Sequence, residues 1–155
     1  MPEANLILAE IEEVEGDEIR KLEYLRKFRS AVSRPGYQTM YNKYLAVLSA
    51  EEFDNSKSAI SIANDEIANR PTPQSYDLLA WAYYHDGKIH EAMEIAKVHV
   101  ENQTFEPESL YHLGIIYQVN GDKIMAAKYL REALDSHFEL GPAISNKIRR
   151  SLEKL

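Results

Sequence analysis

Histidine and acidic side chains are the residues of this chain that could do acid–base or metal chemistry. The sequence has five histidines and no cysteine, which excludes a disulfide, a thiolate metal site and a cysteine nucleophile. His85 and His90 are the closest pair along the chain, but a predicted turn separates them and they lack the one-face spacing of a metal-binding helix. His112 lies one helical turn after Glu108, and His85 could approach it across a stack of helices. No nucleophile elbow, phosphate loop or paired-carboxylate motif accompanies them, so we expect no enzyme activity, metal site or cofactor.

Charge is distributed unevenly along the first part of the chain. The net charge is −7, from 18 basic and 25 acidic residues, and it opposes non-specific attraction to nucleic acid or anionic lipid. An acidic run over 10–18 could attract a basic partner or a cation, although a solvated helix end explains it more simply. A basic set over 20–34, interrupted by Glu23, should fall mainly on an outward helix face. We therefore expect no nucleic-acid partner.

The apolar segments of the chain are short. The longest, 78–84, has seven residues, whereas a bilayer-spanning helix needs about 20, so a membrane span is not expected. The first residues carry no basic segment ahead of an apolar core, so neither a secretory signal nor a transit peptide is expected. The cytoplasm is the slightly favoured compartment, but the sequence does not decide it.

The strongest pattern in the chain is an internal repeat of 34 residues. Gly87 and Gly121 stand 34 residues apart, and five other identities share this offset. They are Pro73 with Pro107, Ser75 with Ser109, Leu79 with Leu113, Tyr83 with Tyr117, and Ala92 with Ala126. Six identities in one register indicate that one structural unit occurs twice.

Each of these units has the pattern of a helix pair. Pro73 predicts the start of the first helix, because proline at this position lacks only a donor that would stay unpaired. The helix should run to about His85 and end at Gly87, which tolerates a left-handed backbone. Apolar residues over 89–100 then recur at the three-and-four spacing of a second helix. The following unit repeats this order and turns at Gly121.

Small residues stand where the two helices of each unit should cross. Ala80 or Gly114 on the first helix, and Ala92 or Ala126 on the second, let the backbones approach closely. A bulky residue at Gly114 should therefore push the two helices apart.

With these motifs the chain resembles the tetratricopeptide repeat (TPR) family, whose unit is a 34-residue helix pair. The motifs read Leu113-Gly114-x-x-Tyr117 followed by Ala126, and Leu79-Ala80-x-x-Tyr83 followed by Ala92. Tyr76 and Leu110 stand where the family has an opening tryptophan. The resemblance implies an all-α fold, a right-handed αα superhelix (TPR solenoid) of about four helix pairs with a C-terminal capping helix.

We expect a single TPR-like domain over 1–155. Its units should cover approximately 2–35, 36–72 (degenerate), 73–106 and 107–140, with the capping helix at 142–155. An apolar stripe that includes Ile144 and Ile148 should let this last helix cover the open end of the solenoid. No comparable helix precedes the first unit, so we expect further repeats or a homodimer at the N-terminal end.

The resemblance also implies a binding surface, because the first helices of stacked units line a concave groove that can hold a peptide. Trp81 and Tyr111 are the expected anchors, since aromatic side chains give large contact area at a modest entropy cost. Packing between helices is the alternative for the rings of Trp81 and Tyr84. The groove candidates are Lys43, Val47, Gln74, Asp77, Trp81, Tyr84, Tyr111, Ile115 and Gln118.

The expected function is a protein–protein interaction scaffold that binds a peptide or protein segment in this groove without catalysis. Family members that hold the C-terminal carboxylate of a chaperone use cationic and amide side chains where this chain has Asp77, Trp81, Tyr111 and Ile115, so that role is not expected. The alternative is a structural or dimerisation segment of a longer protein whose activity lies elsewhere.

Overall fold

The computed structural model describes residues 1–155 apart from the side chain of Gln38. Within these residues all regular secondary structure is helical and there is no strand, which confirms the predicted all-α class. In chain order the α-helices are α1 (Glu3–Glu15), α2 (Glu18–Val32), α3 (Asn42–Glu51), α4 (Ser56–Asn69), α5 (Pro73–His85), α6 (Ile89–Ile95), α7 (Pro107–Val119), α8 (Lys123–Leu134) and α9 (His137–Glu153). A short 3-10 helix, η1 (Gln38–Tyr41), precedes α3, and a π-helical turn, η2 (Ala96–Val100), continues α6. No helix of the described residues is both long enough and apolar enough to cross a membrane.

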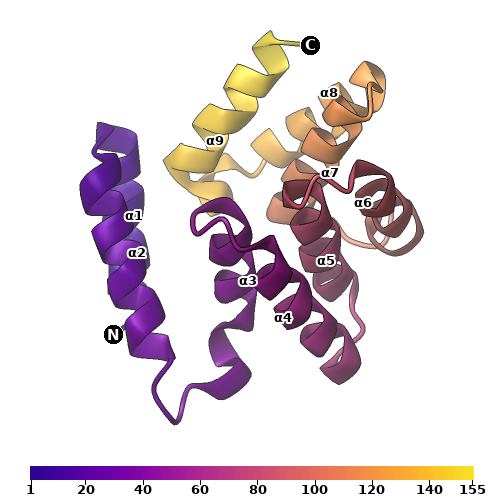
Figure 1. Cartoon of the computed structure of the whole chain (residues 1–155). Coiled ribbons are helices and arrows are strands. Elements are labelled where there is room, and N and C mark those ends of the chain that lie inside the picture. Colours follow the sequence, from indigo (N-terminus) through magenta and orange to yellow (C-terminus); the bar gives the residue numbers. More distant parts are fainter.

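Successive helices pair as hairpins, α1 with α2, α3 with α4, α5 with α6 and α7 with α8 (Figure 1). The later hairpins stack so that α5 contacts both α3 and α7. The last helix, α9, lies between the first hairpin and the α7–α8 hairpin, and it contacts α1 as well as α7 and α8 (Figure 1). The side of the stack formed by α3, α5 and α7 is therefore bordered by α9.

The turns of the repeat have the geometry that its residues favour. Thr72 caps α5 by accepting a hydrogen bond from the backbone N–H of Ser75 at 3.2 Å, and Pro73 occupies the first turn. Gly87 and Gly121 have φ angles of 77° and 90°, in the left-handed region that residues with a Cβ rarely adopt. The first helix of each copy of the 34-residue repeat, α5 in one and α7 in the next, thus begins at a proline and ends shortly before a glycine.

Close helix crossings explain the small residues of the repeat. Ala80, Ala92 and Ala126 are fully buried in the main core, which extends over α5 to α9. At Gly114 of α7, an added Cβ would lie 2.6 Å from Cγ of Leu130 in α8 and 3.1 Å from its backbone nitrogen. The backbones of α7 and α8 can approach this closely only because position 114 has no side chain.

Two helices have an irregular backbone. The C-terminal helix was predicted for 142–155, and in α9 the non-helical Gly141, with a φ of 79° and a ψ of 169°, separates the short stretch that begins at His137 from the helix that continues from Pro142. The second helix of the unit over 73–106 was predicted as one stretch, whereas it is divided into α6 and η2. This division is a local change of backbone hydrogen bonding that an apolar periodicity does not reveal.

Candidate functional site

Most of the predicted groove residues line two hollows on the side formed by α3, α5 and α7. Lys43, Gln74 and Asp77 line the first, which we call the polar hollow. Trp81, Tyr84, Tyr111 and Ile115 line the second, which we call the aromatic hollow. The register of the repeat thus brings seven of the nine candidates to these two places.

The other two candidates have different surroundings. Val47 of α3 packs against the apolar core and borders neither hollow. Gln118 of α7 lies at the contact with α9, where its Nε2 is 3.5 Å from the backbone oxygen of Ser151. These positions therefore support the helix stack and are not open groove residues.

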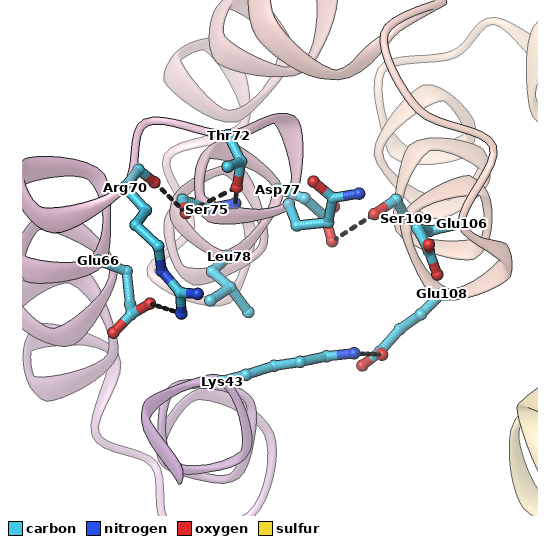
Figure 2. Close-up of a pocket in the computed structure, with 11 residues that line it drawn as sticks. Lys43, Glu66, Arg70, Thr72, Ser75, Asp77, Leu78, Glu106, Glu108 and Ser109 are labelled. Carbon is cyan, nitrogen blue, oxygen red and sulfur yellow. Dashed lines mark hydrogen bonds and ion pairs between the residues drawn. The ribbon is translucent and has the colours of Figure 1, made fainter. Parts of the chain in front are cut away.

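The polar hollow lies at the N-terminal ends of α5 and α7 and has a volume of about 260 Å³ (Figure 2). Lys43 of α3 reaches across it, with Nζ 2.7 Å from the carboxylate of Glu108 on α7. Burial alone would lower the pKa of Lys43, but the charge and hydrogen bond of Glu108 raise it above its ordinary value. The lining includes four carboxylates and two cations, which are Glu66, Asp77, Glu106, Glu108, Lys43 and Arg70. The hollow is therefore richer in negative charge.

Asp77 borders the polar hollow, but its carboxylate is engaged in a buried hydrogen-bond network. It is 5% exposed, and its Oδ2 accepts a hydrogen bond from Ser109 Oγ at 3.1 Å and lies 2.9 Å from Nδ1 of His112. Burial would lower the pKa of His112, yet the charge and hydrogen bond of Asp77 raise it above 6.5. The hydroxyl of Ser109 points to the aspartate and not to the histidine, so these residues do not form a nucleophile with its base.

The aromatic hollow is wider, with a volume of about 450 Å³. Trp81 forms its floor: the indole stacks on His112 at 4.0 Å and on Tyr84 at 4.8 Å between ring centroids. Its Nε1–H donates to Glu51 of α3 at 2.8 Å. The expectation that Trp81 and Tyr111 are open anchors needs correction, because they are only 3% and 7% exposed. Their rings are held mainly by packing, which leaves half-buried Tyr84 as the more accessible aromatic side chain.

One wall of the aromatic hollow comes from α9, which the sequence analysis assigned only to capping. Lys147, Arg150 and Lys154 line this wall. Lys147 pairs with Glu13 of α1 at 2.8 Å, while Arg150 and Lys154 are exposed. These three residues recur at the three-and-four spacing of one helix face, opposite the apolar stripe of α9. This spacing in the sequence could have predicted a basic wall.

Two titratable groups at the aromatic hollow are affected by burial. Burial raises the pKa of Glu51, against the opposing effects of His112, Lys147 and the hydrogen bond from Trp81. Burial also lowers the pKa of His85 to about 4, with smaller contributions from the positive charges of His112 and Lys147. His85 is therefore neutral at pH 7, and its Nε2 is buried without a hydrogen-bond partner among the described residues.

The acidic and histidine side chains of the two hollows are the residue types that could hold a metal ion. Among the described residues, no group of three or more histidine, aspartate and glutamate side chains is arranged to hold a metal ion. Comparisons with protein-family models, curated proteins and solved structures found no match to this chain. Function is therefore inferred from the geometry of the two hollows.

Proposed function

We propose that the protein is a tetratricopeptide-type binding module that holds a peptide or protein segment along the concave side of a right-handed superhelix. One observation carries this proposal: seven positions chosen from the repeat register line two hollows on the same side of α3, α5 and α7. The 34-residue repeat and the close crossing at Gly114 support the assignment to this type of repeat. In this proposal the module binds its ligand through shape and charge and catalyses no reaction.

The distance between the hollows sets the length of the segment. Gln74 in the polar hollow and Tyr84 in the aromatic hollow are ten residues apart on α5. Ten residues correspond to about 15 Å along a helix at roughly 1.5 Å per residue. An extended peptide rises about 3.3 Å per residue, so about five residues span both hollows.

The residues that line the two hollows determine which side chains the bound segment should carry. The surplus of carboxylates in the polar hollow favours a basic side chain. In the aromatic hollow, half-buried Tyr84 favours an apolar side chain, and exposed Arg150 and Lys154 favour an acidic neighbour. We therefore expect an extended ligand with a basic residue at one end and an apolar–acidic pair about five residues away.

A displayed library of random peptides tests this proposal, with the whole chain as bait. Selected peptides should share the expected pattern, and binding should change the fluorescence of Trp81, the one tryptophan of the chain. The double variant Arg150→Glu, Lys154→Glu should weaken binding at least about tenfold by reversing the charge of one wall.

The matched control is Lys128→Glu, Arg131→Glu, which makes the same charge change at exposed positions of α8 outside both hollows. Circular dichroism and thermal melting must show that both variants remain folded. If no peptide is enriched, or if selected peptides bind the α9 variant as tightly as the parent protein, the concave side is not the binding surface.

A further inference from the structure

Helix α1 has an apolar face that no other part of the described chain covers. Ile7, Ile11 and Val14 are 62%, 47% and 50% exposed. Their spacing of four and three residues places them on one side of the helix. Contiguous exposed apolar side chains of this kind mark interaction surfaces on soluble proteins.

This face continues onto the beginning of α9. Ile7, Ile11 and Val14 line a shallow groove together with Pro142, and adjoining hollows extend it across Asn146. Phe138 lies at the far side of the groove and is 91% exposed. We call this surface the α1–α9 face, made of Ile7, Glu10, Ile11, Val14 and Glu15 of α1 and Phe138, Pro142, Asn146, Arg149 and Arg150 of α9.

The two edges of the α1–α9 face have opposite charge. Glu15 lies on the outer α1 edge, and Arg149 and Arg150 lie on the α9 edge, whereas Glu10 lies on the other side of the apolar stripe of α1, against Gly141 of α9. Among the described residues, none of these four side chains forms an ion pair within the chain. The face therefore has acidic Glu15 along its outer α1 edge and two basic residues along α9, with the apolar residues between them.

We propose that the α1–α9 face binds a second copy of this chain and forms a two-fold homodimer. A two-fold contact joins a surface to itself, so the surface must be self-complementary. With the two-fold axis along the groove between α1 and α9, α1 of each copy lies against α9 of the other. This arrangement covers the apolar residues of both copies and places the acidic edge of one opposite the basic edge of the other.

The dimer covers Arg150 at the border of the aromatic hollow but none of the other residues that line the two hollows. Glu15 and Arg149 line neither the polar nor the aromatic hollow, so they can be changed without altering the proposed peptide site. Arg150 borders both surfaces and is not used in the dimer test. Because Arg150→Glu in the peptide test alters both surfaces, that test is compared in the Ile11→Glu background, where the dimer is weakened, and the two proposals can then fail independently.

Sedimentation equilibrium of the full chain between about 1 µM and about 100 µM measures dissociation constants in the micromolar range, which correspond to about −8 kcal/mol at 1 µM. The unchanged protein should sediment as a dimer at the upper end of this range. Ile11→Glu should weaken the dimer at least about tenfold, because it places a charge in the apolar centre. The control Ile124→Glu changes an isoleucine that is 82% exposed on α8, away from the face, and should leave the dimer intact.

A charge exchange tests the orientation of the two copies. Glu15→Arg and Arg149→Glu should each weaken the dimer, and combining them should restore it by exchanging the charges of the two edges. A monomer at every concentration would overturn the proposal. So would a dimer that Ile11→Glu leaves unchanged, or one that the double charge exchange does not recover.

Discussion

The buried imidazole nitrogen of His85 makes the free energy of unfolding depend on pH. Its imidazole borders the aromatic hollow with its ring 4.7 Å from Trp81, and burial lowers its pKa from 6.5 to about 4. The unfolded chain therefore takes up this proton at a higher pH than the folded chain does. Stability from the neutral ring is fully present above pH 6.5 and is lost as the pH falls toward 4.

We predict that His85→Phe removes this loss, because phenylalanine keeps a ring against Trp81 but does not titrate. Urea denaturation of both proteins at pH values from 7 to 4 measures the effect. The free energy of unfolding should fall more steeply with acid in the parent protein than in the variant. Two parallel curves would show that His85 is protonated equally in both states, since all other titrating groups are shared.

The residues of the aromatic hollow were predictable, but the contacts that hold them to other helices were not. Trp81, Tyr84 and Tyr111, which the repeat register placed on one surface, line one hollow. The register gave no sign that Glu51 of α3 accepts a hydrogen bond from Trp81, or that Lys147 of α9 completes the lining. Both contacts join segments at least 30 residues apart, and local periodicity carries no information about such pairs.

At the scale of helices, the crossing of α7 and α8 depends on Gly114. Alanine would favour the helix by about 1 kcal/mol through propensity alone. In this position its Cβ would meet Leu130, including the backbone nitrogen at 3.1 Å, so we expect a clash that costs about 1–3 kcal/mol and a net loss of up to about 2 kcal/mol. Chemical denaturation of Gly114→Ala measures this loss.

A double-mutant cycle with Leu130→Ala separates the clash from other effects of Gly114→Ala. Shortening Leu130 removes the side-chain part of the clash, so the double variant should lose less stability than the two single variants combined. Additive losses would show that the side chain of Leu130 does not cause the loss at position 114.

The packing of α9 can be tested at Ile148, which is fully buried. We expect Ile148→Ala to cost about 2–5 kcal/mol, because it removes buried methyl groups and leaves a cavity between α9 and its neighbours. Ile124→Ala is the matched control at an 82% exposed position and should change stability by less than about 0.5 kcal/mol. Equal effects of the two substitutions would mean that α9 is not packed against the helix stack.

Helix positions were predicted well where the sequence contains strong start and stop signals. Pro73 and Pro107 begin α5 and α7, and Gly87 and Gly121 follow their ends. The contact of α9 with α1 was not predicted, because the stripe containing Ile148 shows which side of the helix is buried but not what covers it.

Across the whole molecule, the first hairpin is attached differently from the other helices. The apolar contacts of this hairpin with the rest of the chain form a separate small cluster, in which Phe28 packs on Tyr41 with ring centroids 5.6 Å apart. Ion pairs provide further links, from Lys21 to Glu52 at the end of α3 and from Lys147 on α9 to α1. The main core, by contrast, is continuous from α5 to α9. The first hairpin should therefore open more easily than the rest.

Native-state hydrogen exchange tests this difference, because it measures opening free energies along the chain. Using Ile11→Glu keeps association through α1 from contributing to protection. Amides of α1 and α2 should exchange through openings that cost less than those of α7 and α8. Adding Phe28→Ala, which truncates a fully buried ring, should lower protection in the first hairpin while α7 and α8 keep theirs. An equal loss in all four helices would mean that the molecule unfolds as one cooperative unit, with the small cluster at Phe28 coupled tightly to the main core.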